Sequence, residues 1–212
     1  MSPVATQTPT TTHDTRRHRI LLWASLLLPL AVLVAAIAIS VSGEVATLEQ
    51  GRPAPSFTLP ATNGAWVTLS DVIADGDALL YFSMGPGCDG CFAQIPEIEG
   101  PLADLGIRLV PIMVDPPAMV DSEARRFGIE TPILIDADRS VSQAYEMIGV
   151  YGHADRPSHS FALVDSDGRI KQVLHFAEMF VPFDQLWGDI EDSALALIVD
   201  RTAGGSAMVK PS

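Results

Sequence analysis

The sequence predicts one α/β domain in which a central mixed sheet is flanked by helices. Short apolar runs rich in strand-forming residues alternate with longer segments whose apolar residues recur every three or four positions. This alternation extends over residues 51–198, a length that suits one hydrophobic core. Strands that alternate with helices pack as a layered α/β sandwich.

The central sheet should begin with a buried strand. Residues 78–82 are apolar and favour a buried strand. The first strand of the central sheet is therefore expected here.

A helix should follow the segment that contains the cysteines. Its apolar residues recur at helical spacing: Phe92, Ile95, Ile98 and Leu102. Proline lacks the backbone N–H that a helix interior needs, so we expect Pro96 to kink this helix. We expect the pair Gly100-Pro101 to end it.

The middle of the domain should contain two further strands and a helix between them. Residues 106–115 read as a central strand. Asp115 offers an acceptor side chain for a helix N-cap and two prolines follow, so a helix should begin there. Gly128 should end it, and residues 133–136 should form the next strand.

The last part of the domain should close the sheet with a hairpin. Ser140 and Gln143 have the spacing of a capping box before a short helix. Residues 161–164 and 173–176 read as two strands joined by a tight turn. A closing amphipathic helix should follow from Phe183.

Cys88 and Cys91 are the only cysteines of the chain, and they are the candidate functional residues. They lie where the strand 78–82 gives way to the predicted helix. Unpaired N–H groups and the helix dipole favour a thiolate at this point, so Cys88 should be the nucleophile. Cys91 lies within the first turn and should be the more buried, resolving thiol, while the negative charge of Asp89 opposes the Cys88 thiolate slightly.

Two other interpretations of the pair are weaker than reversible redox chemistry. A structural disulfide across two intervening residues restrains the unfolded chain little. A zinc site needs about four ligands, usually from a second cysteine pair or from paired histidines. The chain has no second pair, and its histidines show no ligand spacing: His13, His18, His153, His159 and His175.

At this point the sequence resembles the thioredoxin-like superfamily, in particular the membrane-anchored redoxins of the TlpA and AhpC/TSA type. The Cys-x-x-Cys pair matches, and so does Pro96, five residues after Cys91. Residues 51–59, followed by Asn63-Gly64 and residues 67–71, resemble the family's N-terminal hairpin, and residues 163–170 resemble its late strand, turn and strand. The resemblance implies a thioredoxin-like sandwich, a Cys88–Cys91 disulfide and a thiol–disulfide oxidoreductase that needs no cofactor and no metal.

The sequence also departs from the thioredoxin pattern. Gly87 stands where thioredoxins usually carry Trp, and Asp89-Gly90 replaces the usual dipeptide that tunes the reduction potential. The family's cis-proline beside the disulfide has Pro157 as its candidate here. Pro157 lies two residues too early, however, and His159 stands in the usual place. A His159 side chain beside Cys88 would stabilise its thiolate or join a metal site.

Two alternative functions follow from these comparisons. The first is a peroxiredoxin-like thiol peroxidase in which Cys88 reduces hydroperoxides. The peroxidatic motif has Pro seven residues and Thr or Ser three residues before the reactive cysteine, and Tyr81 and Gly85 stand there instead. The second is a non-enzymatic copper-binding module that uses both cysteines and His159.

The N-terminal part of the chain predicts a membrane anchor. Residues 20–42 carry no charge, and a helix of this length spans about 34 Å, enough for a hydrocarbon core of about 30 Å. Secretory signal cores are shorter, about 7 to 15 residues, and no convincing cleavage motif follows, which favours an uncleaved anchor over a signal peptide. The basic residues before it are Arg16, Arg17 and Arg19.

These basic residues predict the orientation, because positive charges stay on the cytoplasmic side. Residues 1–19 should be a disordered cytoplasmic tail, 43–50 a linker, 51–198 an extracytoplasmic redox domain and 199–212 a flexible tail. We expect extracytoplasmic protein disulfides or dithiols as substrates and a membrane electron donor. The net charge of −13 argues against nucleic acid as a partner.

Overall fold

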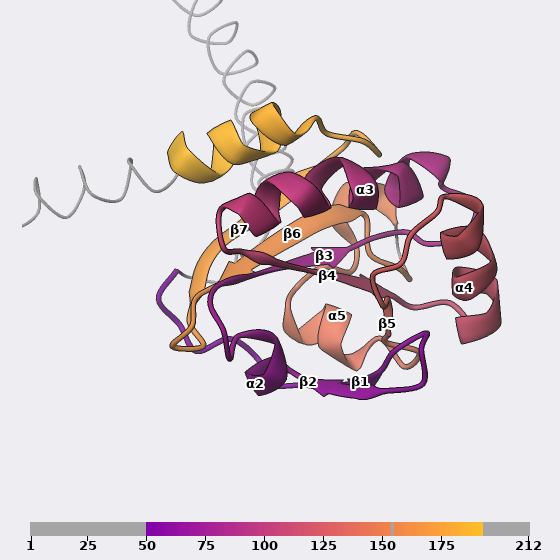
Figure 1. Cartoon of the computed structure of the whole chain (residues 1–212), viewed down its shortest axis with the longest axis horizontal. Coiled ribbons are helices and arrows are strands. Elements are labelled where there is room, and N and C mark those ends of the chain that lie inside the picture. Colours follow the sequence, from indigo (N-terminus) through magenta and orange to yellow (C-terminus); the bar gives the residue numbers. More distant parts are fainter. Residues whose placement is uncertain (1–49, 154, 193–212) are drawn as a thin grey trace, which may run out of the picture. The chain divides into compact units, whose positions relative to one another are not determined.

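A five-stranded mixed sheet forms the centre of the domain (Figure 1). The computed structural model describes residues 50–153 and 155–192. The strands are β1 (Thr58–Pro60), β2 (Trp66–Thr68), β3 (Ala78–Phe82), β4 (Arg108–Met113), β5 (Leu134–Ile135), β6 (His159–Val164) and β7 (Ile170–Phe176). The helices are α2 (Leu69–Val72), α3 (Asp89–Asp104), α4 (Pro117–Arg126) and α5 (Ser140–Ala144), with a 3-10 turn at Val150–Gly152 and helical residues 183–192.

The sheet has the order β5-β4-β3-β6-β7, and β1 and β2 form a separate antiparallel hairpin. β3 is parallel to β4 and antiparallel to β6, and β7 is antiparallel to β6. The C-terminal ends of β3 and β4 and the N-terminal end of β6 therefore meet at one edge. The predicted α/β sandwich with a mixed central sheet is confirmed, and so are the two predicted hairpins.

Two apolar layers cover the two faces of the sheet. Strand β3 shows the division, because its successive side chains point to opposite faces. Leu79 and Tyr81 pack in the core beneath α3, while Leu80 and Phe82 pack in the core on the other side. Figure 1 shows α3, α4 and the helical residues 183–192 over one face, with α2, α5 and the β1–β2 hairpin over the other.

Helix α3 continues through both of its prolines, so the predicted break at Gly100-Pro101 is wrong. A proline in a helix interior costs about 3 kcal/mol. The apolar face of the helix is fully buried, and each such side chain contributes about 1.5–3 kcal/mol. Packing therefore outweighs the prolines, and the helix ends only at Leu105, before Gly106 turns into the left-handed region (φ 73°).

Helices α4 and α5 begin within two residues of the predicted positions, but neither has the predicted side-chain cap. Pro116 precedes α4 without a side-chain cap bond, because the Asp115 carboxylate faces Arg156 instead. At α5 the N–H of Ser140 donates to the Asp138 carboxylate at 3.0 Å, and Ser140 and Gln143 form no capping box. Asp115 and Arg156 are distant in sequence and are brought together by the tertiary fold, whereas the contact between Asp138 and Ser140 is local.

A capping box does occur at α2, where the sequence pattern was overlooked. The Thr68 side chain accepts from the Asp71 N–H at 3.1 Å, and the Asp71 carboxylate accepts from the Thr68 N–H at 2.9 Å.

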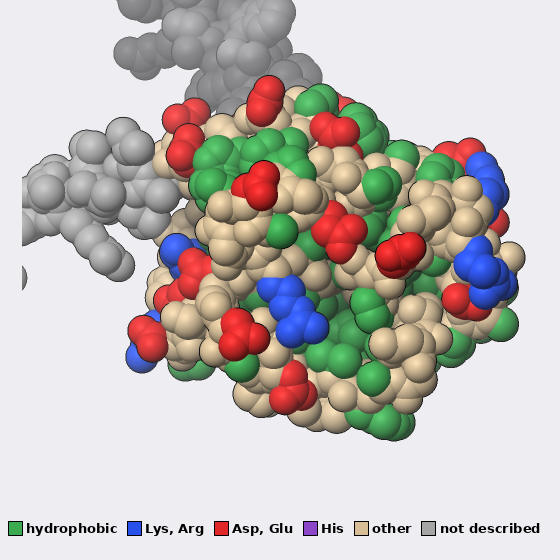
Figure 2. Space-filling view, viewed as in Figure 1, with side chains coloured by type: hydrophobic (Ala, Val, Ile, Leu, Met, Phe, Trp, Pro, Cys, Tyr) green, Lys and Arg blue, Asp and Glu red, His purple; other side chains and the backbone are tan. Residues whose placement is uncertain are grey.

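Figure 2 shows acidic side chains spread over the described part of the visible face, in keeping with the acidic composition.

The predicted anchor and tails lie outside the described residues. This applies to residues 1–49, which include the apolar stretch 20–42 and nearly all of the linker, and to residues 193–212. Among the residues that are described, none of the helices is both long and apolar enough to cross a bilayer.

Candidate functional site

The cysteine pair lies at the N-terminus of α3, as the sequence predicts. Cys88 is the N-cap residue, and Cys91 lies in the first helical turn. Their sulfur atoms form a disulfide, with the two Cα atoms 5.3 Å apart. Cys88 keeps 5% of its surface exposed, whereas Cys91 is completely buried. An attacking thiolate can therefore reach only the Cys88 side of the bond.

The start of the helix also provides a hydrogen bond for the outer sulfur. The backbone N–H of Cys91 donates to Sγ of Cys88 at 3.2 Å. When the disulfide is open, this N–H and the helix dipole stabilise negative charge on Cys88. The carboxylate of Asp89 lies 2.7 Å from the guanidinium of Arg126 in α4, and this ion pair offsets the unfavourable charge of Asp89.

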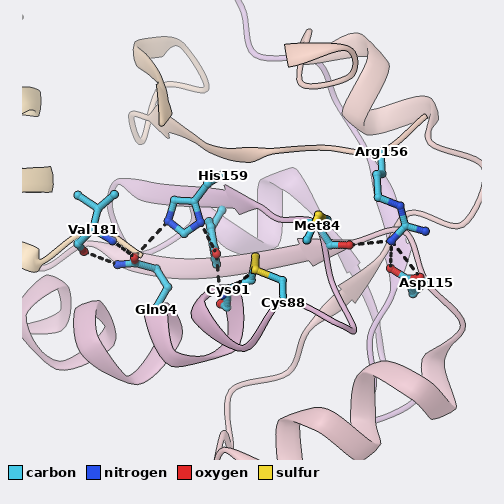
Figure 3. The surroundings of a disulfide bond; sticks show 9 residues. Met84, Cys88, Cys91, Gln94, Asp115, Arg156, His159 and Val181 are labelled. Carbon is cyan, nitrogen blue, oxygen red and sulfur yellow. Dashed lines mark hydrogen bonds and ion pairs between the residues drawn. A yellow bond between two sulfur atoms is a disulfide. The ribbon is translucent and has the colours of Figure 1, made fainter. Parts of the chain in front are cut away.

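Two residues near the ends of neighbouring strands, Asp115 after β4 and Arg156 before β6, hold the loop that precedes Cys88 in place. Arg156 donates to the carbonyl oxygen of Met84 at 2.9 Å and pairs with Asp115 at 3.4 Å. The Asp115 carboxylate lies against Gly85, whose φ of 83° is in the left-handed region, and a Cβ at residue 85 would collide with it. Figure 3 shows Arg156 and Asp115 on one side of Cys88 and His159 on the other.

A chain of buried hydrogen bonds lies on the His159 side of the pair (Figure 3). The Tyr81 hydroxyl lies 3.1 Å from the Cys91 carbonyl oxygen and 3.0 Å from Nδ1 of His159. Nε2 of His159 lies 3.1 Å from Oε1 of Gln94. Gln94 in turn binds both backbone groups of Val181, at 2.9 and 2.7 Å.

The backbone of Val181 determines which nitrogen of His159 carries the proton. Its N–H must donate and its carbonyl must accept, so Oε1 of Gln94 is an acceptor. Nε2 of His159 must then be the donor to Gln94, and Nδ1 of the neutral ring accepts from Tyr81. Burial lowers the pKa of His159 to about 4, so the ring is neutral at pH 7.

A segment formed by residues 177–181 covers the start of α3. Gly90 lies so close to this segment that a Cβ there would be 2.7 Å from the carbonyl oxygen of Met179. The second residue between the cysteines must therefore be small. Gln94 holds the far end of the same segment through Val181.

Gly90→Ala should displace the segment 177–181. Alanine favours a helix by about 0.5–1 kcal/mol over glycine, but overpacking costs about 1–3 kcal/mol. We expect a net loss of unfolding free energy and faster deuterium exchange of the Val181 amide. Gly100→Ala in the same helix is the matched control, because a Cβ there meets nothing within 4 Å and should be neutral or stabilising. Equal behaviour of the two variants would contradict the contact.

Comparison with known proteins now places the chain in a family. The AhpC/TSA family matches residues 50–173, which is more than half of the chain. The chain belongs to the AhpC/TSA family. With its Cys88–Cys91 pair it is an oxidoreductase of the thiol–disulfide and peroxiredoxin-like kind.

Relatives of both kinds are similar to this AhpC/TSA member. The thiol-disulfide oxidoreductase ResA of Bacillus subtilis is 25% identical over 132 residues, which cover 60% of this chain and 68% of ResA. The peroxiredoxin Bcp of Escherichia coli K12 is 28% identical over 136 residues, which cover 59% of this chain and 85% of Bcp. The crystal structure of peroxidoxin BcpB from Mycobacterium tuberculosis shares the fold, with a TM-score of 0.55, 24% identity and coverage of 70% and 95% of the two chains.

The structure of this family member brings some of the predicted residues together and separates others. His159, predicted from its alignment with the family's proline position, reaches Cys91 through Tyr81. Pro96 lies inside α3 beyond the cysteine turn. Pro157 bridges to Ile148 just before β6, and all described peptide bonds, including its own, are trans.

Four contributors to the site escaped the sequence-based prediction: Tyr81, Gln94, Asp115 and Met179. Gln94 gave a usable signal, because it is a polar residue one position before Ile95 on the apolar face of a predicted helix. Arg156 is also only partly exposed, and it donates to the carbonyl oxygen of Met84. The other contacts join segments that are distant in sequence.

The described residues offer little support for a copper site. Both ring nitrogens of His159 are engaged, one with Tyr81 and one with Gln94. Within residues 50–153 and 155–192, His, Cys, Asp and Glu side chains form no group of three that could hold a metal ion.

Proposed function

We propose that the chain catalyses thiol–disulfide exchange with partner proteins through Cys88 and Cys91. The observation that carries this proposal is the arrangement of the pair: one sulfur at the surface of a helix start and one buried directly beneath it. The same arrangement supports the predicted roles of Cys88 as nucleophile and Cys91 as resolving thiol. Pro96 would contribute only through the course of α3, and His159 through Tyr81.

In the reductive direction, the Cys88 thiolate attacks one sulfur of a partner disulfide. A Cys88–partner disulfide forms, and the partner's other sulfur leaves as a thiolate that takes a proton. Cys91 then loses its proton and attacks Sγ of Cys88, which releases the partner's second thiol. The Cys88–Cys91 disulfide is restored, and both electrons have moved to the partner.

Peroxide reduction is the second candidate function, because the relative Bcp of E. coli is a peroxiredoxin. The loop before Cys88 argues against it. Gly85 stands where the peroxidatic motif carries a hydroxyl group, and the Asp115 carboxylate fills the space that such a side chain would need. A rate of hydroperoxide consumption no higher than that of free cysteine would remove this candidate.

The cellular setting is proposed from the sequence. Residues 20–42 would anchor the chain in a membrane by a single span, with the N-terminus cytoplasmic and the redox domain extracytoplasmic. The partners would then be extracytoplasmic protein disulfides or dithiols, and a membrane electron donor would reduce the pair again. Tagging both ends of the full chain and testing protease access in intact cells would check this orientation.

A Cys91→Ser variant tests the exchange reaction. Without the resolving thiol, Cys88 should remain joined to its partners as mixed disulfides in the native membrane. These adducts should appear on non-reducing gels and disappear with dithiothreitol. The matched control is the Cys88→Ser/Cys91→Ser double variant, which should form none. Absence of adducts from the single variant would overturn the proposed function.

A further inference from the structure

His159 is a buried titratable group that the exchange steps do not use. Its side chain is fully buried on the face of the sheet that carries α3. The groups facing it from each packed element are Tyr81 from β3, Cys91 and Gln94 from α3, Phe161 from β6, Phe176 from β7 and Val181 from the covering segment. In the disulfide form none of these groups carries a charge.

The hydrogen-bond chain around His159 has two arrangements. With a neutral ring, Tyr81 donates to Nδ1 and Nε2 donates to Gln94. With a proton on Nδ1, the ring would donate to the Tyr81 oxygen. The hydroxyl would then donate to the Cys91 carbonyl oxygen, which lies 3.1 Å away. In the first arrangement the single hydroxyl proton goes to Nδ1, so the Cys91 carbonyl oxygen accepts from Tyr81 only in the second.

The other cations near the cysteine pair already face carboxylates. Arg126 pairs with Asp89 at 2.7 Å, and Arg156 pairs with Asp115 at 3.4 Å. A thiolate on the largely buried Cys88 therefore adds a negative charge that these pairs do not balance. His159 is the nearby group that can change its own charge to balance it.

We propose that His159 takes up a proton at Nδ1 when the Cys88–Cys91 disulfide is reduced. Two electrons from a dithiol reductant break the sulfur–sulfur bond. Cys88 becomes a thiolate, Cys91 takes one proton and becomes a thiol, and Nδ1 of His159 takes the second proton. At pH values between the oxidised and the reduced midpoints of the His159 titration, the site thereby gains two electrons and two protons, so its net charge does not change.

The inference rests on the proposed redox activity of the pair. Its sign follows from electrostatics: a nearby negative charge favours the protonated ring, so the midpoint of the His159 titration must rise on reduction. His175 is an internal control. His175 lies 2.8 Å from the Ser160 hydroxyl and is opposite Ser160 in the pairing of β6 with β7. Successive residues of a strand point to opposite faces, so Ser160 and His175 face the side of the sheet away from His159.

The test is an NMR titration of the full chain in detergent, labelled with 15N at histidine. His159→Gln identifies the His159 signal by its loss. In the oxidised protein we expect the midpoint near 4, because burial lowers the pKa of His159 to about 4. In dithiothreitol it should rise by at least about one pH unit, the usual effect of an opposite charge nearby. The midpoint of His175 should stay within a few tenths of a unit.

Cys88→Ser separates the charge effect from a general loosening of the site. This variant has no Cys88 thiolate, so its His159 midpoint should stay near the oxidised value in dithiothreitol. A rise of equal size in this variant, or no rise in the reduced native chain, would overturn the inference. If dithiothreitol fails to open the disulfide at all, the proposed function itself is wrong, so the two failures are distinguishable.

Discussion

Replacing Cys88 with serine should reduce thiol–disulfide exchange by about a thousand-fold or more, as loss of a covalent nucleophile typically does. Cys88 carries the reactive sulfur with exposed surface and the hydrogen bond from the helix start. A serine hydroxyl at the same position is not ionised at neutral pH and forms no disulfide. The measurement is the rate at which the full chain catalyses reduction of a model protein disulfide by dithiothreitol.

Cys91→Ser gives the matched comparison for that result. This variant keeps the nucleophile. When it is reduced beforehand and freed of dithiothreitol, it should attack the partner disulfide, release one equivalent of partner thiol and then stall. Cys88→Ser should show neither the burst nor turnover. If Cys88→Ser retained the burst and Cys91→Ser lost it, the assigned roles of the two cysteines would be reversed. Circular dichroism of both variants checks that the fold is retained.

Gly85→Ala should be among the most destabilising single substitutions in the loop before Cys88. Gly85 has a φ of 83°, and a left-handed backbone costs a non-glycine residue about 1–2 kcal/mol. The new methyl group would also collide with the Asp115 carboxylate, and overpacking of this kind costs about 1–3 kcal/mol. We expect the unfolding free energy to fall by about 2–5 kcal/mol in a denaturant titration.

Gly64→Ala separates the two contributions. Gly64 has nearly the same backbone angle, a φ of 84°, but a Cβ there meets nothing within 4 Å. This control should lose only the conformational part, about 1–2 kcal/mol. Equal losses in the two variants would show that the Asp115 carboxylate moves aside without penalty. The close contact at Gly85 would then have no role in fixing the loop.

The parts of the site that were predictable depend on local sequence. A buried strand before Cys88 and a helical apolar pattern after it place the cysteine at a helix start, whatever lies around it. The β6–β7 hairpin was predictable for the same reason, because turn residues lie between two short strand-like runs, whereas the β1–β2 hairpin was expected from the family resemblance. The break at Gly100-Pro101 was predicted from an equally local rule and was wrong, since burial of the α3 face is a property of the whole domain.

The surroundings of the pair required the fold. Asp115 was expected to cap α4, but the meeting of strand ends at one sheet edge brings it to Arg156 and Gly85. The sequence around Gln94 shows only an ordinary helix residue. In the structure its side chain binds the backbone N–H and carbonyl groups of Val181, which is distant in sequence. A shift of a few tenths of an ångström makes or breaks a hydrogen bond of this kind, and residue spacing in a sequence does not specify positions so finely.

The sequence by itself determined the chemistry: two thiols, three positions apart, at the start of a helix that favours a thiolate. The position of Cys91 within the first helical turn also predicted that it is the more buried sulfur. Only the tertiary structure decided which residue between the cysteines must be glycine and which charges lie nearby. The reason is physical. Helix starts and turns arise from neighbours in the chain, whereas burial, collision and ion pairing arise between segments that the folded sheet brings together.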